Sequence, residues 1–165
     1  MLILNSGGTF NKIYNKIDGE LEVPYNNDAI EQILQTYEDS YDLAGVVYKD
    51  SLEMESEDRK MIANIIAHSQ DKEFVLVHGT DTMDKTAEFL DTIFEDRVIV
   101  LVGAMKPFEI DKVEATLNLG MAIGFLKAKP QNGVYICMSG YIAPWDKIVK
   151  NHSDGKFELY LEGTE

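Results

Sequence analysis

The sequence is poor in cysteine and in positive charge. Its single cysteine, Cys137, excludes a disulfide within the chain and is typical of a protein from a reducing compartment. Its 15 lysines and arginines are outnumbered by 29 aspartates and glutamates, which gives a net charge of −14. Such an acidic chain is a poor partner for nucleic acid or for an anionic membrane surface, so we expect neither.

Long apolar runs are also missing. No run of 18 apolar residues occurs, so we expect no helix that spans a membrane. The apolar residues 1–4 are too few for the core of a signal peptide and lead directly into a turn. We therefore expect a cytoplasmic protein.

Several motifs with a known chemistry are absent. The sequence contains neither of the phosphate-binding patterns GxGxxG and GxxxxGK[ST], and it lacks the GxSxG turn of serine hydrolases. His68, His78 and His152 do not have the spacing of metal ligands, and HExxH does not occur. We expect no metal and no organic cofactor, and we interpret each histidine as structural.

The sequence does contain a regular alternation of strand and helix patterns. Its 165 residues, 45% of them hydrophobic, suffice for one well-buried domain. We expect strands at residues 2–4, 43–48, 74–77, 98–102 and 134–138, with helices between them and a short hairpin near residues 18–19. This order predicts an α/β fold with three layers, a parallel sheet between two layers of helices. We expect the tail from Gly140 to be irregular, apart from a short strand at residues 157–161.

Residues 74–89, FVLVHGTDTMDKTAEF, form the most informative stretch. A buried strand is followed by Gly79 and then by Thr80 and Asp81, where a helix should begin. In open α/β sheets, ligands bind beside the carboxyl ends of the strands. Polar or small residues follow the other strands too, namely Gly7, Thr9, Ser51 and Ala104. We therefore expect a functional site at this edge of the sheet.

Three segments, SGGTF at 6–10, HGTDTM at 78–83 and VGAMKP at 102–107, resemble the bacterial-type L-asparaginases in order and spacing. The resemblance covers nearly the whole chain, but only the amino-terminal domain of that family. It implies a three-layer parallel sheet like that domain. Residues 1–165 are then expected to form a single asparaginase-like amino-terminal domain without the family's carboxyl-terminal domain.

The resemblance also implies an activity, the hydrolysis of a side-chain amide through an acyl-threonine intermediate. Thr9 would be the nucleophile, and a loop tyrosine, Tyr14 or alternatively Tyr25, would help to activate it. Thr80, Asp81 and a lysine would form the second catalytic set, with Lys150 as the candidate and Lys147 as the fallback. A threonine hydroxyl is a weak nucleophile until a base takes its proton, which Tyr14 and Lys150 could carry.

Substrate contacts are implied in the same way. Ser51 would hold the substrate carboxylate, and Ala104 would offer a backbone contact to the departing amide. The backbone of Gly7, Gly8, Gly79 and Thr80 would donate to the oxyanion.

The sequence departs from the family next to Ser51, where a polar residue that touches the substrate's α-amino group is replaced by Leu52. An apolar side chain cannot satisfy an ammonium. Our hypothesis is therefore a hydrolase for a small amide other than free asparagine, such as an ω-amide without the α-amino group. A different class of function, a catalytically silent module that binds a small ligand or a partner protein, stays open, as does ester or lactone hydrolysis. We also expect a homodimer, because a lone amino-terminal domain would expose the surface on which the second domain packs.

Overall fold

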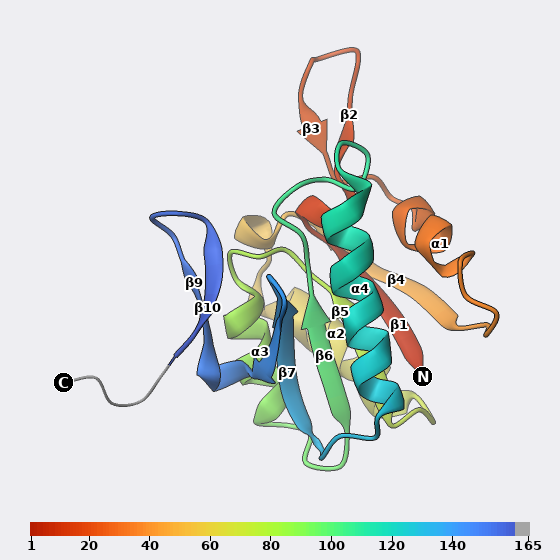
Figure 1. Cartoon of the computed structure of the whole chain (residues 1–165), viewed down its shortest axis with the longest axis vertical. Helices are drawn as coiled ribbons and strands as arrows, with labels where there is room; N and C mark the ends of the chain where they lie inside the picture. The colour runs from red at the N-terminus through yellow and green to blue at the C-terminus, as the bar shows by residue number, and fades with distance from the viewer. Residues whose placement is uncertain (161–165) are drawn as a thin grey trace.

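The computed structural model describes residues 1–160, which form one main sheet and two small antiparallel sheets (Figure 1). The main sheet has the strand order β4-β1-β5-β6-β7-β8, and the small sheets are β2–β3 and β9–β10. The strands are β1 (Leu2–Gly7), β2 (Ile13–Tyr14), β3 (Leu21–Glu22), β4 (Asp42–Lys49), β5 (Glu73–Val77), β6 (Val98–Val102), β7 (Gly133–Met138), β8 (Tyr141–Pro144), β9 (Ile148–Asn151) and β10 (Lys156–Leu159). The helices are α1 (Asp28–Leu34), α2 (Ser56–His68), α3 (Met83–Asp91) and α4 (Lys112–Lys127), with short 3-10 turns η1 (Thr9–Asn11), η2 (Ser51–Glu53) and η3 (Trp145–Lys147).

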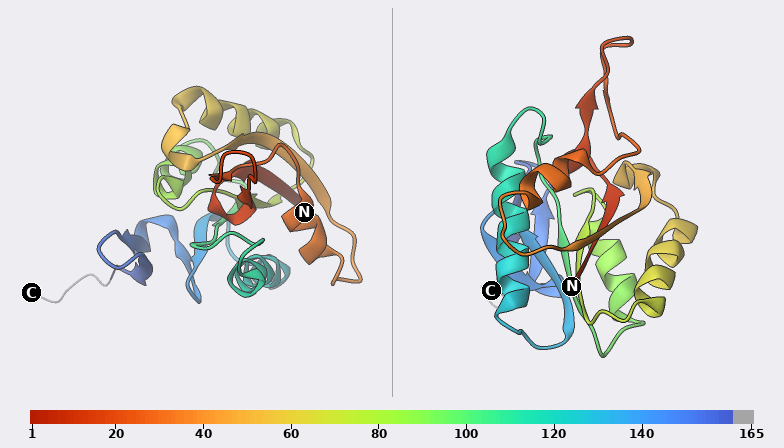
Figure 2. Two further views of the ribbon diagram at one scale, coloured as in Figure 1. Left: turned by 90° about the horizontal axis from the view of Figure 1, so that it is seen from above. Right: turned by 90° about the vertical axis from the view of Figure 1, so that its right-hand side faces the viewer.

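The central strands are apolar throughout because helices cover both faces of the sheet (Figure 2). Successive side chains of a strand point to opposite faces. In β5, Val75 and Val77 pack with α1 and α4, whereas Phe74 and Leu76 pack with α2 and α3. The predicted three-layer α/β fold is therefore confirmed.

Local signals fix where two of the helices start. At α2, the Glu55 and Asp58 side chains and backbones form a reciprocal capping box. At α4, the Asp111 side chain accepts a hydrogen bond from the Val113 amide. None of the helices within residues 1–160 is both long and apolar enough to cross a lipid bilayer.

The prediction of a purely parallel sheet is wrong at one edge. Strands β4, β1, β5, β6 and β7 are parallel, but β8 runs antiparallel to β7, with Tyr135 opposite Pro144. Ser139 and Gly140 form the two-residue turn between them, with φ values of 54° and 85°. Tight hairpins require such positive φ values, and a Ser-Gly pair provides them. The tail that we expected to be irregular therefore begins with an ordered hairpin, and its second strand, β8, forms one edge of the sheet.

The next segment forms a second hairpin, β9–β10, in which Lys150 pairs with Phe157. Phe157 is only 4% exposed and belongs to the core on the α2–α3 side of the sheet, so it anchors this hairpin to the body. A strand was predicted at residues 157–161; the observed strand is Lys156–Leu159, and Leu161 lies outside the described residues. The predicted hairpin around residues 18–19 is also present, as β2–β3, and projects from the body (Figure 1).

Candidate active site

Loops at the carboxyl ends of β1, β4 and β5 lie in direct contact. A Cβ atom on Gly8 would lie 2.4 Å from the Gly79 nitrogen, and one on Gly79 would lie 2.5 Å from the Ser51 hydroxyl oxygen. Gly8 also has a φ of 77°, which residues with a side chain rarely adopt. The absence of two side chains therefore lets these three loops meet at one edge of the sheet.

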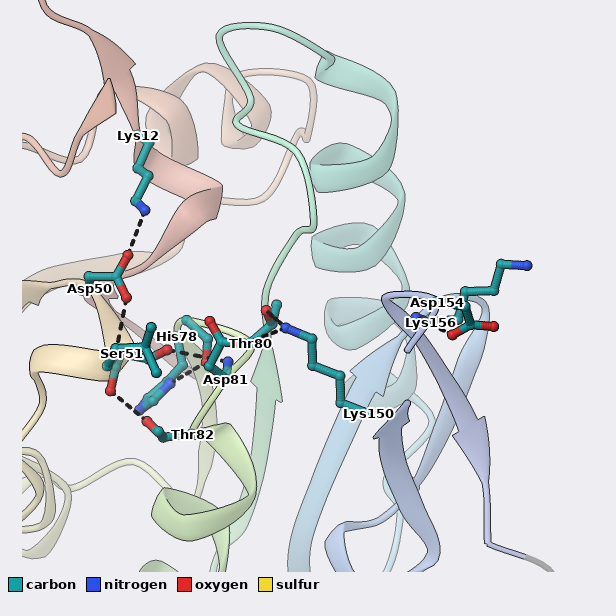
Figure 3. A network of polar contacts seen from close by, with 12 residues as sticks. Lys12, Asp50, Ser51, His78, Thr80, Asp81, Thr82, Lys150, Asp154 and Lys156 are labelled. Carbon is teal, nitrogen blue, oxygen red and sulfur yellow. Dashed lines mark hydrogen bonds and ion pairs between the residues drawn. The ribbon is translucent and has the colours of Figure 1, made fainter. Parts of the chain in front are cut away.

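The side chain of Lys150 extends from β9 to the turn after β5 (Figure 3). Its Nζ donates hydrogen bonds to Thr80 Oγ1 at 2.9 Å and to Asp81 Oδ1 at 2.6 Å. The Lys150 side chain is 11% exposed, so this contact is largely shielded from water. Of the two candidate lysines, it is Lys150 whose ammonium binds Thr80 and Asp81. Lys147 lies in η3, with its Nζ 3.8 Å from Asp146 Oδ2.

The turn that carries Thr80 and Asp81 is held from the side of β4. Ser51, 1% exposed, accepts a hydrogen bond on its hydroxyl from the Asp81 amide at 3.3 Å. Its carbonyl accepts a hydrogen bond from the Thr82 hydroxyl at 2.8 Å. Ser51 therefore orients the Asp81 backbone, a contact that the sequence did not predict.

Leu52 follows Ser51 and points into solvent. Its side chain is 74% exposed, while its amide donates to the Asp50 carboxylate at 3.0 Å. The structure thus presents an apolar surface beside Ser51.

Thr9 occupies η1, directly after the two glycines, and is partly exposed. A buried asparagine pair supports this turn. Asn11 Nδ2 donates to Asn5 Oδ1 at 3.0 Å and to the Gly7 carbonyl at 2.7 Å. Sequence reasoning missed both asparagines; the available signal was an amide residue at the end of an apolar strand, where an unpaired polar group would be costly.

The expected oxyanion donors are only partly available. The Gly7 amide donates to Asn5 Oδ1 at 2.9 Å, and the Gly8 amide donates to the Lys49 carbonyl at 2.9 Å. These two amides are engaged, so the expectation that they face an oxyanion is wrong in this arrangement. The amides of Gly79 and Thr80 have no hydrogen-bond partner within residues 1–160.

Both candidate tyrosines are exposed at the surface. Tyr14 is 53% exposed on β2, and a Cβ atom on Gly19 would lie 3.6 Å from its hydroxyl, which shows that the ring points along its own hairpin. Tyr25 is 86% exposed and packs its ring 5.9 Å from that of Tyr48. The structure therefore brings Lys150 to Thr80 and Asp81 and leaves both tyrosine side chains exposed, with Tyr25 beside Lys12, Asp50 and Leu52.

Lys12 and Asp50 form an ion pair at the entrance to the site, with 2.5 Å between Nζ and Oδ2 (Figure 3). Burial raises the pKa of Asp50, but the Lys12 hydrogen bond, the Leu52 amide and the charges of Lys12 and Lys150 outweigh it and hold the pKa below its ordinary value. The carboxylate is therefore ionised and fastens the loop after β1 to the end of β4. The sequence analysis did not identify this pair.

Ala104 follows β6 and is fully buried. The Asn118 side chain donates to the preceding Gly103 carbonyl at 3.0 Å, and the Glu114 carboxylate accepts from the Met105 amide at 2.8 Å. This loop is therefore held on both sides of Ala104 by α4.

His78 is a fully buried residue beneath the site. Its Nδ1 lies 2.8 Å from the Gly79 carbonyl, so Nδ1 carries the proton, and Nε2 accepts from the Thr86 hydroxyl at 2.8 Å. Burial lowers its pKa to about 4, so the ring is neutral at pH 7. This geometry agrees with the structural role that we predicted for His78. Within residues 1–160, no group of three or more His, Cys, Asp or Glu side chains is arranged to hold a metal ion.

A cavity of about 370 Å³ opens beside Lys150. Thr80, Asp81 and Lys150 line its polar side, while Trp145 and Phe157 line its apolar side. The site therefore has an apolar flank next to the β9–β10 hairpin.

Comparisons with known proteins agree with this arrangement. A family model described as "Asparaginase, N-terminal" matches residues 1–157. L-asparaginase 2 of Escherichia coli is 36% identical over 83 residues, which cover 48% of this chain and 24% of that protein. One component of the glutamyl-tRNA(Gln) amidotransferase of Methanococcus maripaludis is 29% identical over 147 residues, 84% of this chain and 34% of that protein. The solved structure of the thermostable L-asparaginase from Thermococcus kodakarensis superposes with a TM-score of 0.82 at 24% identity, covering 96% of this chain and 50% of that chain.

The chain thus spans half or less of the length of these relatives. The structural likeness, at 24% identity, shows a shared fold. Membership follows from the family model, which matches almost all of the described residues. The chain belongs to the asparaginase family and corresponds to its amino-terminal domain.

Proposed function

We propose that this chain is an amidohydrolase that cleaves a small-molecule carboxamide and releases ammonia through an acyl-threonine intermediate. The observation that carries the proposal is the contact of Lys150 with Thr80 and Asp81, at the sheet edge that also bears Thr9. Family membership supports the reaction class.

In this proposal the Thr9 hydroxyl attacks the amide carbonyl. A C–O bond forms, the amide C–N bond breaks, and the threonine proton is transferred to the departing nitrogen, which leaves as ammonia. Water then hydrolyses the ester and restores the Thr9 hydroxyl. The free amides of Gly79 and Thr80 are positioned on the loop that contacts Gly8, where they can stabilise the developing oxyanion.

Proton transfer is assigned to Lys150 and Tyr14. Lys150 Nζ lies 2.9 Å from Thr80 Oγ1, within the distance for direct proton exchange. Tyr14 points along its hairpin, so it takes part only after the β2–β3 hairpin closes over Thr9.

Leu52 directs the choice of substrate. Its side chain is 74% exposed beside Ser51, where an α-ammonium would need a polar partner. We propose an ω-amide of a small carboxylic acid without the α-amino group, such as succinamate. One relative is named as part of an amidotransferase for a tRNA-linked substrate. The net charge of −14 favours a free small molecule for this chain instead.

Ammonia release by the purified chain tests this function. The panel is asparagine, glutamine, succinamate, glutaramate and a β-aspartyl amide. We expect turnover of succinamate that falls by about a thousandfold or more in Thr9→Ala and in Thr80→Ala, because both hydroxyls act on the reacting groups. Thr92→Ala is the matched control, since Thr92 is an exposed threonine at the end of α3. A strong preference of the wild-type chain for asparagine would overturn the substrate assignment.

A non-catalytic binding module is the second candidate, favoured by the exposure of both tyrosine side chains, which are 53% and 86% exposed. It predicts no ammonia from any amide by a folded chain. It also predicts that succinamate still shifts the thermal unfolding temperature of the wild type and of Thr9→Ala equally.

A further inference from the structure

His78 donates a hydrogen bond to the peptide group that follows it, and this bond fixes the direction of a free amide. Its Nδ1 lies 2.8 Å from the Gly79 carbonyl oxygen, which can only accept. The Gly79 carbonyl and the Thr80 amide belong to the same peptide group, and none of the peptide bonds among the described residues is cis. In a trans peptide the N–H points away from the C=O. The bond that turns the carbonyl toward His78 therefore turns the Thr80 amide away from it.

The Thr80 amide lacks an acceptor. Thr80 is only 6% exposed, yet its N–H makes no hydrogen bond to any other group of residues 1–160. Buried backbone amides are nearly always paired with protein or with water. A free amide beside Lys150 and Asp81 therefore marks a place where an oxygen of a bound ligand can accept a hydrogen bond.

A chain of directional hydrogen bonds holds the His78 ring from behind. Because Nδ1 carries the proton of the neutral ring, Nε2 can only accept, and it accepts from Thr86 Oγ1 at 2.8 Å. Thr86 Oγ1 in turn accepts from Arg59 Nε at 3.0 Å. A hydroxyl has one hydrogen, and Thr86 uses it on His78. His78 and Thr86 are both fully buried, so water does not compete for these bonds.

Arg59 is the outer end of this chain. It lies in the first turn of α2, and its Nη1 also donates to the Met54 carbonyl at 3.3 Å, just after η2. Two donors of one planar guanidinium thus hold α3 and the loop after β4 in a fixed relation. Burial and, to a smaller degree, the charge of Arg59 lower the pKa of His78 to about 4, which keeps Nε2 free to accept.

We propose that Arg59 is a remote positioning residue, which acts through Thr86 and His78 to hold the Thr80 amide toward the reacting carbonyl oxygen of the substrate. This role rests on the proposed function, and it explains how the turn after β5 presents a free donor. Loss of an oxyanion donor typically lowers kcat by about 10²–10³, so misdirection of the donor should cost part of that factor.

Nitrogen-15 NMR of the histidine rings tests the chain of bonds without any turnover. We expect His78 of the wild type to carry its proton on Nδ1 at neutral pH. A proton on Nε2 would overturn the proposal, because Nδ1 could then not donate to the Gly79 carbonyl.

A titration with succinate tests where the Thr80 amide points. Succinate is the acid that hydrolysis of succinamate would release, and its carboxylate can accept from the amide without reacting. We expect a downfield shift of the Thr80 amide proton in the wild type. The shift should be clearly smaller in Arg59→Met and in Thr86→Val, which keeps the branched shape of threonine but lacks its hydroxyl. Thr92→Val, at an exposed position that ends α3, is the control and should match the wild type. No shift in the wild type, or equal shifts in all four proteins, would overturn the proposal.

Kinetics separate positioning from stability. Arg59→Met and Thr86→Val should lower kcat for ammonia release by about tenfold or more while KM stays within about threefold, because the oxyanion charge develops only in the transition state. Thr86→Ser restores the hydroxyl and should recover most of kcat. Lys60→Met is the matched control, since it removes a positive charge from the next, exposed position of α2. A lower melting temperature with unchanged kcat in Arg59→Met and Thr86→Val would limit these residues to stability and overturn the proposal.

Failure of the proposed function would look different. A wild type that releases no ammonia from any amide of the panel would refute the hydrolase. The His78 tautomer and the succinate titration would still decide whether Arg59 directs the Thr80 amide toward a ligand.

Discussion

The ammonium of Lys150 lies 2.9 Å from the hydroxyl of Thr80, although 70 positions separate the two residues in the chain. The contact connects the small β9–β10 sheet to the edge of the main sheet. Its geometry depends on Phe157, which faces Lys150 across the hairpin and is buried in the core. A packing residue therefore sets where the Lys150 ammonium lies.

Replacement of Lys150 by methionine should lower kcat for ammonia release by roughly 10²–10⁴, the range typical of losing a general acid–base group. The change keeps the length of the side chain and removes the group that binds Thr80 and Asp81. Steady-state kinetics with the best amide of the panel provides the measurement, and circular dichroism checks the fold. Lys147→Met is the control. An equal loss in both variants would show that the assignment of Lys150 is mistaken.

Replacement of Asn11 by alanine should lower kcat more than it changes KM. The side chain donates to Asn5 Oδ1 and to the Gly7 carbonyl, which fixes the turn that carries Thr9. Leaving the buried Gly7 carbonyl without this donor should also reduce the free energy of unfolding by about 1–3 kcal/mol. Kinetics and urea unfolding measure the two effects. Asn64→Ala, at an exposed position of α2, serves as the control. Unchanged kcat in a destabilised Asn11→Ala would limit Asn11 to a role in stability.

Gly8 and Gly19 allow backbone strain to be separated from steric contact. Their φ values are 77° and 79°, but a Cβ atom on Gly8 would collide with Gly79, whereas one on Gly19 has only the Tyr14 hydroxyl at 3.6 Å. Gly19→Ala should cost about 1–2 kcal/mol, the strain of a left-handed alanine. Gly8→Ala should cost several kcal/mol more and abolish activity. Thermal unfolding of both variants tests this, and equal losses would contradict the close approach of the two loops.

His78 should make the protein less stable in mild acid. Burial holds its pKa near 4, below the ordinary value of 6.5, so between these pH values the unfolded chain binds a proton that the folded chain does not. The free energy of unfolding should therefore fall as the pH is lowered from about 6.5 to 4, by roughly 3 kcal/mol at most. Urea unfolding at pH 7, 5.5 and 4.5 measures this loss. His78→Gln keeps an acceptor for Thr86 and should flatten this part of the profile; an unchanged slope would assign the acid sensitivity to other groups.

Much of the fold followed from the sequence because its signals are local. The apolar run at β5 and the polar turn after it predicted a strand, a loop and a helix in that order. The parallel arrangement then placed Thr9, Ser51 and Thr80 at one edge without knowledge of any contact. Lys150 was selected by resemblance alone, since nothing in its neighbourhood distinguishes it from Lys147.

The remaining features depend on contacts between distant segments. The position of Asn5 at the end of an apolar strand was a signal for a buried amide, but its pairing with Asn11 could not be predicted, because an amide at a strand end can be either exposed or buried. The β7–β8 hairpin was missed because the chain from Gly140 was expected to be irregular, whereas Ser139 and Gly140 form a tight turn. Tyr14 was expected near Thr9 from its place in the chain, but the direction of a short hairpin is determined by its packing.

Because Lys150 lies on the β9–β10 hairpin, its contact with Thr80 and Asp81 can form only late in the synthesis of the chain. Ribosomes deliver a chain from its amino end, so Thr9 emerges first, Thr80 and Asp81 follow, and Lys150 emerges well after them. The five parallel strands of the main sheet have all left the ribosome before this lysine does. During synthesis, the five parallel strands can therefore pair before Lys150 is available. Until then, the Asp81 carboxylate lacks the ammonium that binds it in the complete structure. The contact of Lys150 with Thr80 and Asp81 is then among the last to form during synthesis, and its formation would report that the β9–β10 hairpin has docked.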